Sequence, residues 1–155
     1  MGQITTAELG VSVSLPLSYA NIKLILHLLE LRMDIRVLRT YVSGMNESQD
    51  EIKDYENDFE IDFIDEFDDS INEDEFNQIC DELELDRSRL TFHFIYNCAS
   101  IYASNISFRQ TSHLFYSNQC TPLEFIANIQ KGADTFRAAQ VPEHLILIGH
   151  SIYDG

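Results

Sequence analysis

The sequence has few glycines and few basic residues, and each shortage excludes a class of function. With 6 glycines among 155 residues, no two lie close enough to form a P-loop or a dinucleotide-binding loop. Only 10 Lys and Arg residues stand against 26 Asp and Glu, so the formal net charge is −16. A charge of this size repels nucleic acids and anionic membranes, and we expect neither as a direct partner. Basic proteins are the expected electrostatic partners.

Cysteine is also scarce, and its distribution indicates a reducing compartment. Cys80, Cys98 and Cys120 are odd in number, widely spaced and free of any C-x-x-C motif. This pattern argues for buried thiols and against a disulfide framework. No Lys or Arg precedes Lys23, so the basic region of a signal peptide is missing. The longest apolar run, residues 22–33, is too short and too charged to span a membrane. We therefore expect a cytoplasmic protein.

Motifs for catalysis and for metal binding are missing as well. The five histidines show neither H-E-x-x-H nor a compact Cys/His spacing. Residues 149–151 match the start of the nucleophile elbow G-x-S-x-G, but Tyr153 stands where its last glycine belongs. We expect no catalytic residue, no metal site and no cofactor. A small enzyme whose carboxylates and histidines meet only in three dimensions stays open as the least favoured alternative.

The negative charge is concentrated in one segment of the chain. Nineteen of the 26 acidic residues and one of the 10 basic residues, Lys53, lie between Glu47 and Asp86. This acidic segment therefore has a net charge of −18, and the remaining residues together carry +2. Such an asymmetry indicates an interaction surface, because charges that serve only solubility would be scattered.

Length and apolar patterning predict a single α+β domain over residues 1–155, with about four helices and a short antiparallel sheet. The apolar content of 45%, with 10 Phe and 7 Tyr, is enough for a core. Alternating or β-branched segments predict strands, and capping residues followed by helical apolar spacing predict helices. The expected strands lie within 3–17, 90–103, 106–116 and 144–153, with a helix as the alternative for 90–103, whose apolar spacing fits either element.

Two of the expected helices lie outside the acidic segment. One begins near Tyr19 with Ser18 as its N-cap and ends near Thr40, with a strand over 35–42 as the alternative. The other follows Thr121-Pro122 and ends before Val141. Its apolar residues at helical spacing are expected to face inward; they are Leu123, Ile126, Ile129, Ala133 and Phe136.

The acidic segment itself predicts two further helices. The spacing of Ile52, Tyr55, Phe59, Phe63 and Phe67 favours an amphipathic helix over 52–67, although residues 59–63 also alternate like a strand. A second helix is expected over 71–85, where Ser70 and Glu73 form a capping box. Helical apolar stripes usually face the core, so we favour a core position for Phe59, Phe63 and Phe67 over a role as partner anchors.

Three interpretations of the acidic segment can be compared. A calcium site of the EF-hand type is excluded, because that loop needs a central glycine and the segment has none. The capping box at Ser70 argues against disorder of the whole segment, and mobility of residues 47–69 alone stays open. A folded negative surface remains, whose carboxylates would imitate the phosphates of a nucleic acid and bind a basic protein.

The sequence therefore predicts a non-catalytic acidic protein that covers a nuclease or another nucleic-acid-binding protein, as an inhibitor or immunity-type protein. The alternative is a regulatory or scaffold module that binds through hydrophobic contacts or by homodimerisation. The acidic residues expected to bind the partner are Asp58, Glu60, Asp62, Asp65, Glu66, Asp68, Asp69, Glu73, Asp74, Glu75, Asp81, Glu82 and Glu84.

Overall fold

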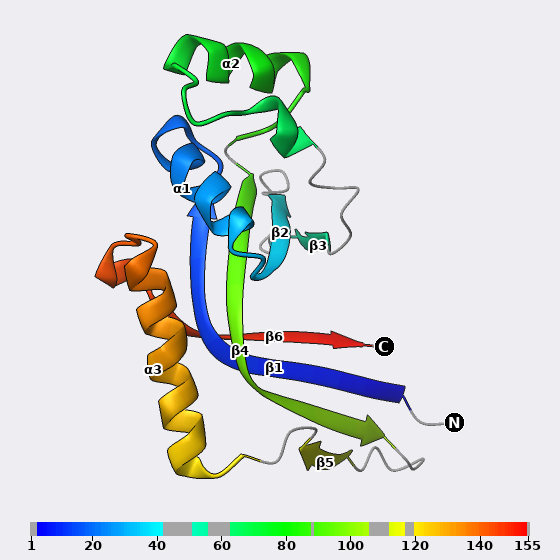
Figure 1. Ribbon diagram of the computed structural model, residues 1–155. Helices are drawn as coiled ribbons and strands as arrows, with labels where there is room; N and C mark the ends of the chain where they lie inside the picture. Colours follow the sequence, from blue (N-terminus) through cyan, green and yellow to red (C-terminus); the bar gives the residue numbers. More distant parts are fainter. Residues whose placement is uncertain are drawn as a thin grey trace. The chain divides into compact units, whose positions relative to one another are not determined.

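The computed structural model describes residues 3–41, 51–55, 63–87, 89–105, 112–116 and 120–154 (Figure 1). These residues form three α-helices and six β-strands, which confirms the α+β class. The chain divides into two compact units. We call Met1–Val13 with Ile95–Gly155 the first unit, and Ser14–Phe94 the second unit.

Two long strands, β1 (Gln3–Pro16) and β4 (Leu90–Asn105), contribute residues to both units. They are antiparallel neighbours. In the second unit the Leu17 amide donates a hydrogen bond to the Leu90 carbonyl at 2.9 Å. In the first unit Gly10 lies so close to β4 that a Cβ would be 1.9 Å from the Tyr96 carbonyl oxygen. Only a glycine allows the two backbones to come this close. The strands predicted within 3–17 and 90–103 are both confirmed.

The second unit has the strand order β3-β2-β4-β1 and two helices. Its elements are α1 (Tyr19–Glu30), β2 (Asp34–Tyr41), β3 (Glu51–Tyr55) and α2 (Glu73–Glu82). Strands β2 and β3 are antiparallel. Helix α1 packs against α2, where the rings of Tyr19 and Phe76 lie 6.0 Å apart between centroids.

Helix α1 begins at the predicted residue but ends earlier than expected. Ser18 is its N-cap, because the hydroxyl of Ser18 accepts a hydrogen bond from the Asn21 amide at 3.3 Å. The helix ends at Glu30, about ten residues before the predicted end. Arg32 then has a φ of 54°, which a helix cannot continue through. The chain next forms β2, so the strand alternative was the correct one.

The helix predicted over 52–67 is wrong, and the start of the next helix is corrected. The described part of that range forms β3 and a single 3-10 turn at 63–66; residues 56–62 lie outside the description. Helix α2 confirms the helix predicted over 71–85, but Asn72 is its N-cap in place of Ser70. The amide and hydroxyl of Ser70 instead donate to Oδ1 of Asp68, at 2.9 and 2.8 Å. This local turn competes with an earlier start of the helix.

Aromatic side chains form the core of the second unit. Phe67 packs on Phe76 at 5.3 Å between ring centroids, and Phe63 meets the edge of Phe92 at 6.2 Å. Phe92 and Phe94 alternate along β4, so their side chains share one face, and both are fully buried. Aromatic pairs contribute about 0.5–1.5 kcal/mol each beyond the area they bury. The core interpretation is thereby confirmed for Phe67, which is 4% exposed.

The first unit has the strand order β5-β4-β1-β6 and one helix. Its elements are β5 (Ser112–Tyr116), α3 (Pro122–Ala138), a 3-10 turn (Glu143–Leu145) and β6 (Leu147–Asp154). Strand β6 is antiparallel to β1, and β5 to β4. The predicted helix with Thr121 as N-cap and the predicted terminal strand are confirmed.

One face of α3 differs from the prediction. Leu123 and Ile126 were expected to face inward, but they are 79% and 54% exposed, whereas Phe136 is fully buried. Gly132, which is also buried, lies nine residues after Leu123. At 100° per residue these two positions project from opposite sides of the helix. Close packing at Gly132 therefore directs Leu123 to the solvent.

Candidate functional site: an acidic face on the second unit

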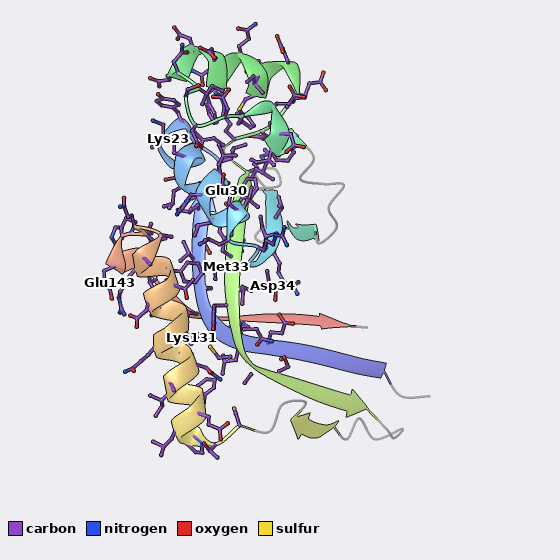
Figure 2. The ribbon with its side chains drawn as sticks, viewed as in Figure 1. Lys23, Glu30, Met33, Asp34, Lys131 and Glu143 are labelled. Atoms are coloured by element: carbon purple, nitrogen blue, oxygen red, sulfur yellow. The ribbon has the colours of Figure 1, made fainter. Side chains whose placement is uncertain are left out.

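All predicted site residues that the structure describes lie at the surface of the second unit. Figure 2 shows oxygen-tipped side chains projecting from α2. We call these ten exposed residues the acidic face: Asp65, Glu66, Asp68, Asp69, Glu73, Asp74, Glu75, Asp81, Glu82 and Glu84. The other three predicted residues, Asp58, Glu60 and Asp62, lie outside the described residues.

Apolar side chains between the acids hold this segment against the unit. Phe67 and Ile71 are each 4% exposed, and Phe63 is half-buried against Phe92. The acids between them, such as Asp65 and Asp69, remain in water. The segment thus has an anchored side and a charged side. The described part of the acidic segment from residue 63 onward is a folded surface, which extends the predicted folded part toward the N-terminus by residues 63–69.

The cap of α2 fixes the second half of the acidic face. Oδ1 of Asn72 accepts a hydrogen bond from the Glu75 amide at 2.8 Å, and Nδ2 of Asn72 donates to Oε1 of Glu75 at 2.6 Å. Glu73 and Asp74 join Glu75 in the first turn. Carboxylates at this end of a helix are stabilised by its dipole, by about 0.3–1 kcal/mol each at an exposed site. Their position is therefore favourable despite their mutual repulsion.

Few of these carboxylates are neutralised within the described part of the chain. Asp81 is the one member of the acidic face with a salt bridge there, to Arg87 at 3.7 Å. Both side chains are substantially exposed, so this pair contributes little. Just beyond the acidic face, Asp86 pairs with Arg89 at 3.2 Å. The acidic face consequently keeps nearly all of its negative charge.

The thiol within this region is part of the core. Cys80 is fully buried on the inner side of α2, as Phe76 is. Burial raises the pKa of Cys80, and the nearby charge of Arg87 only partly offsets this. The thiolate, which is the nucleophilic form, is therefore disfavoured. Cys80 therefore belongs to the core, and the groups that this surface presents to a partner are its carboxylates.

A hollow of about 430 Å³ opens beside the acidic face, between α1 and the segment that precedes α2. Half of its lining is apolar and half is acidic. Its apolar base is formed by Leu26, Leu29, Ile64 and Phe67, and its rim by Glu30, Asp65, Asp68 and Asp69. We call it the α1 hollow. It brings three of the predicted site residues together and leaves the acids of α2 outside.

Five of the eight residues that line the α1 hollow were not predicted as site residues: Leu26, Leu29, Glu30, Ile64 and Phe67. Leu26, Leu29 and Glu30 belong to α1 and are distant in sequence from the acidic segment. Figure 2 labels Glu30 at the end of that helix. Their helical spacing identifies a helix, but no sequence signal places the helix beside residues 64–69. Only the packing of α1 within the second unit shows that the helix lies beside residues 64–69.

Away from the acidic face, two polar residues, Ser14 on β1 and His93 on β4, lie beside each other. A hydrogen bond of 2.6 Å joins Oγ of Ser14 and Nδ1 of His93. The antiparallel pairing that joins Leu17 to Leu90 also places residue 14 opposite residue 93. The contact is thus a direct cross-strand pair. Strand register, which the sequence did not reveal, brings these two residues together.

Comparison with known proteins gives no assignment: no family model, no curated protein and no solved structure matches the chain. Among the described residues, no group of three or more His, Cys, Asp or Glu is arranged to hold a metal ion. No helix in the described ranges is long and apolar enough to cross a membrane.

Proposed function

We propose that the chain is a non-catalytic binding protein whose acidic face docks on the basic surface of another protein. A nuclease or another nucleic-acid-binding protein is the partner that this charge fits best, because its cleft is built for phosphates. The carboxylates would occupy the positions of those phosphates and inhibit the partner. The free, largely buried cysteines fit the cytoplasmic location that is part of this proposal.

One observation carries the proposal. All ten described members of the acidic face are exposed, and only Asp81 has a salt bridge among the described residues. A folded surface of unpaired like charges destabilises the free protein by self-repulsion. A basic partner removes this repulsion on binding. It also accelerates association through long-range attraction, which salt screens.

The test replaces four acids of the face with their amides: Asp65→Asn, Glu66→Gln, Asp68→Asn and Asp69→Asn. Partners captured from the native host are identified, and their association rates with both forms are measured at low and high salt. We expect salt to slow association of the native chain strongly, and the amide variant to associate slowly at either salt concentration. Association that responds neither to salt nor to the substitutions contradicts the proposal.

The first unit supports the alternative of hydrophobic contact or homodimerisation. Four large apolar side chains there are more than half exposed; they are Leu123, Ile126, Leu147 and Ile148. Exposed apolar surface is typical of contact sites. Light scattering over a range of protein concentration tests self-association. Replacing Leu147 and Ile148 with Thr should abolish a dimer that depends on β6 and leave salt-dependent binding unchanged.

A further inference from the structure

The α1 hollow combines two surfaces that favour different parts of one ligand. Leu26, Leu29 and Ile64 are half-buried at its base, and Phe67 is nearly fully buried. The four carboxylates of its rim are exposed. No salt bridge within the described residues involves Glu30 or the three aspartates of the rim. The hollow therefore offers an apolar contact and an unneutralised negative charge within one site.

This lining selects among ligand chemistries. A purely apolar group would remove water from the rim carboxylates without pairing them, which is costly. A calcium ion prefers six to eight oxygen ligands and gains nothing from the apolar base. A flexible aliphatic stem with a cationic end satisfies both surfaces, because the stem covers apolar atoms while the charge stays among the acids. Arginine and lysine side chains have this form.

We propose that the α1 hollow receives an arginine side chain from the basic partner. The proposal rests on the proposed function, because it names the contact by which the acidic face holds that partner. Arginine is favoured over lysine, because its planar guanidinium pairs with two carboxylate oxygens at once and makes a well-defined contact. Arginine is also enriched among the residues that dominate interface energies.

The hollow and the acids of α2 then have different roles. The acids of α2 and of the turn that follows it, such as Glu73 and Glu84, attract the partner over a distance. The hollow provides the desolvated contact that slows dissociation. At about 150 mM salt, interactions beyond about 8 Å are largely screened, so the contact in the hollow should dominate there.

The test uses short blocked peptides as probes. The first is Gly-Lys-Leu-Arg-Leu-Lys-Gly; the second has citrulline, a neutral analogue of the same shape, in place of arginine; the third has lysine there. Amide shifts in NMR spectra of the full chain locate binding and give the affinity. We expect the arginine peptide to shift residues 26–30 and 64–69 and to bind about fivefold more tightly than the citrulline peptide.

Matched variants separate the hollow from the remainder of the acidic face. D65N/D69N removes two rim charges that make no described hydrogen bond, and should weaken the arginine peptide about fivefold at 150 mM salt. E73Q/E84Q removes one charge from α2 and one from the turn that follows it, and should have less than half that effect. Leu29→Ser changes the base of the hollow and should weaken binding, whereas Leu31→Ser, on an exposed residue just beyond α1, should not.

The outcomes also distinguish this proposal from the proposed function. Equal binding of the arginine and citrulline peptides overturns the hollow as a cation site. Tighter binding of the lysine peptide overturns the choice of arginine. An equal loss in D65N/D69N and E73Q/E84Q means that charge acts diffusely, which overturns the hollow and retains the proposed function. If no basic peptide shifts any residue of the acidic face even at low salt, both proposals fall.

Discussion

The ring of Tyr96 occupies the space that a side chain on Gly132 would need. A Cβ built on Gly132 would lie 2.8 Å from Cδ1 of Tyr96 and 3.0 Å from its Cγ. These ring atoms are close to the backbone of β4, so they cannot swing away as the end of a long side chain would. Helix α3 can approach the sheet of the first unit this closely only because residue 132 has no side chain.

Gly132→Ala should therefore lower the free energy of unfolding by up to about 2 kcal/mol. Overpacking costs about 1–3 kcal/mol, and the better helix propensity of alanine returns about 1 kcal/mol. Urea unfolding measures the change. In a Tyr96→Ala background the same substitution should cost less, because the ring is gone and only the contact with Cγ2 of Val11, at 3.1 Å, remains. An unchanged cost in that background would show that the Tyr96 ring is not the obstacle.

The cap of α2 gives a prediction in which two neighbouring polar residues should behave differently. Asn72→Ala removes the acceptor for the Glu75 amide and should cost about 0.5–2 kcal/mol of stability. Ser70→Ala removes only an exposed bond to Asp68 and should stay within about 0.5 kcal/mol of the native chain. Urea unfolding of both variants checks this. A larger cost at Ser70 would support the cap that the sequence predicted.

The three thiols should differ in their rates of reaction with a disulfide reagent such as Ellman's. Cys80 and Cys98 are 0% and 2% exposed, and burial raises the pKa of each thiol. Both should react only as the protein unfolds. Cys120 is half-buried and should react first. Cys120→Ser should remove the fast phase alone; a fast phase that survives would place a reactive thiol elsewhere.

An ion pair in the first unit should make stability depend on acidity. Arg137 donates hydrogen bonds to both carboxylate oxygens of Glu143, at 2.9 and 2.7 Å. This lowers the folded-state pKa of Glu143 below the 4.5 of the free side chain. The unfolded chain thus binds this proton at a higher pH. The stabilisation is complete above pH 4.5 and is lost as the pH falls through the lower folded-state pKa.

Glu143→Gln should accordingly reduce the loss of stability between about pH 5 and 3. Thermal unfolding across that range provides the measurement. Glu84→Gln removes an exposed carboxylate that has no described ion pair, and serves as the control for the loss of one charge. Identical pH profiles for Glu143→Gln and the native chain would exclude a role for this pair.

Local chemistry predicted two of the three helix caps correctly; for α2 it indicated Ser70 in place of Asn72. Ser18 and Thr121 cap helices in the structure as the sequence predicted, because a capping hydrogen bond involves residues only three apart. Alternation favoured strands for β1 and β4, although the apolar spacing of residues 90–103 fits a helix as well. The class of the fold followed from these elements, since each needs a partner face to bury.

The errors arose where distant contacts decide between local options. Residues 34–41 have the composition of a helix or a strand, and pairing with β3 selects the strand. Leu123 has the spacing of a core residue, but the close packing at Gly132 turns it outward. The exposure of the described acids was predictable. The position of Glu30 beside Asp65, Asp68 and Asp69 was not predictable, because no local pattern joins α1 to residues 64–69.

Asp68 differs from the other acids on the rim of the α1 hollow in its freedom of motion. One of its oxygens already accepts two hydrogen bonds from Ser70, and the other oxygen is not used in that turn. A side chain held in one rotamer before a partner arrives loses little conformational entropy on binding. Asp68 therefore provides a fixed point on a rim whose other carboxylates can adapt to the partner.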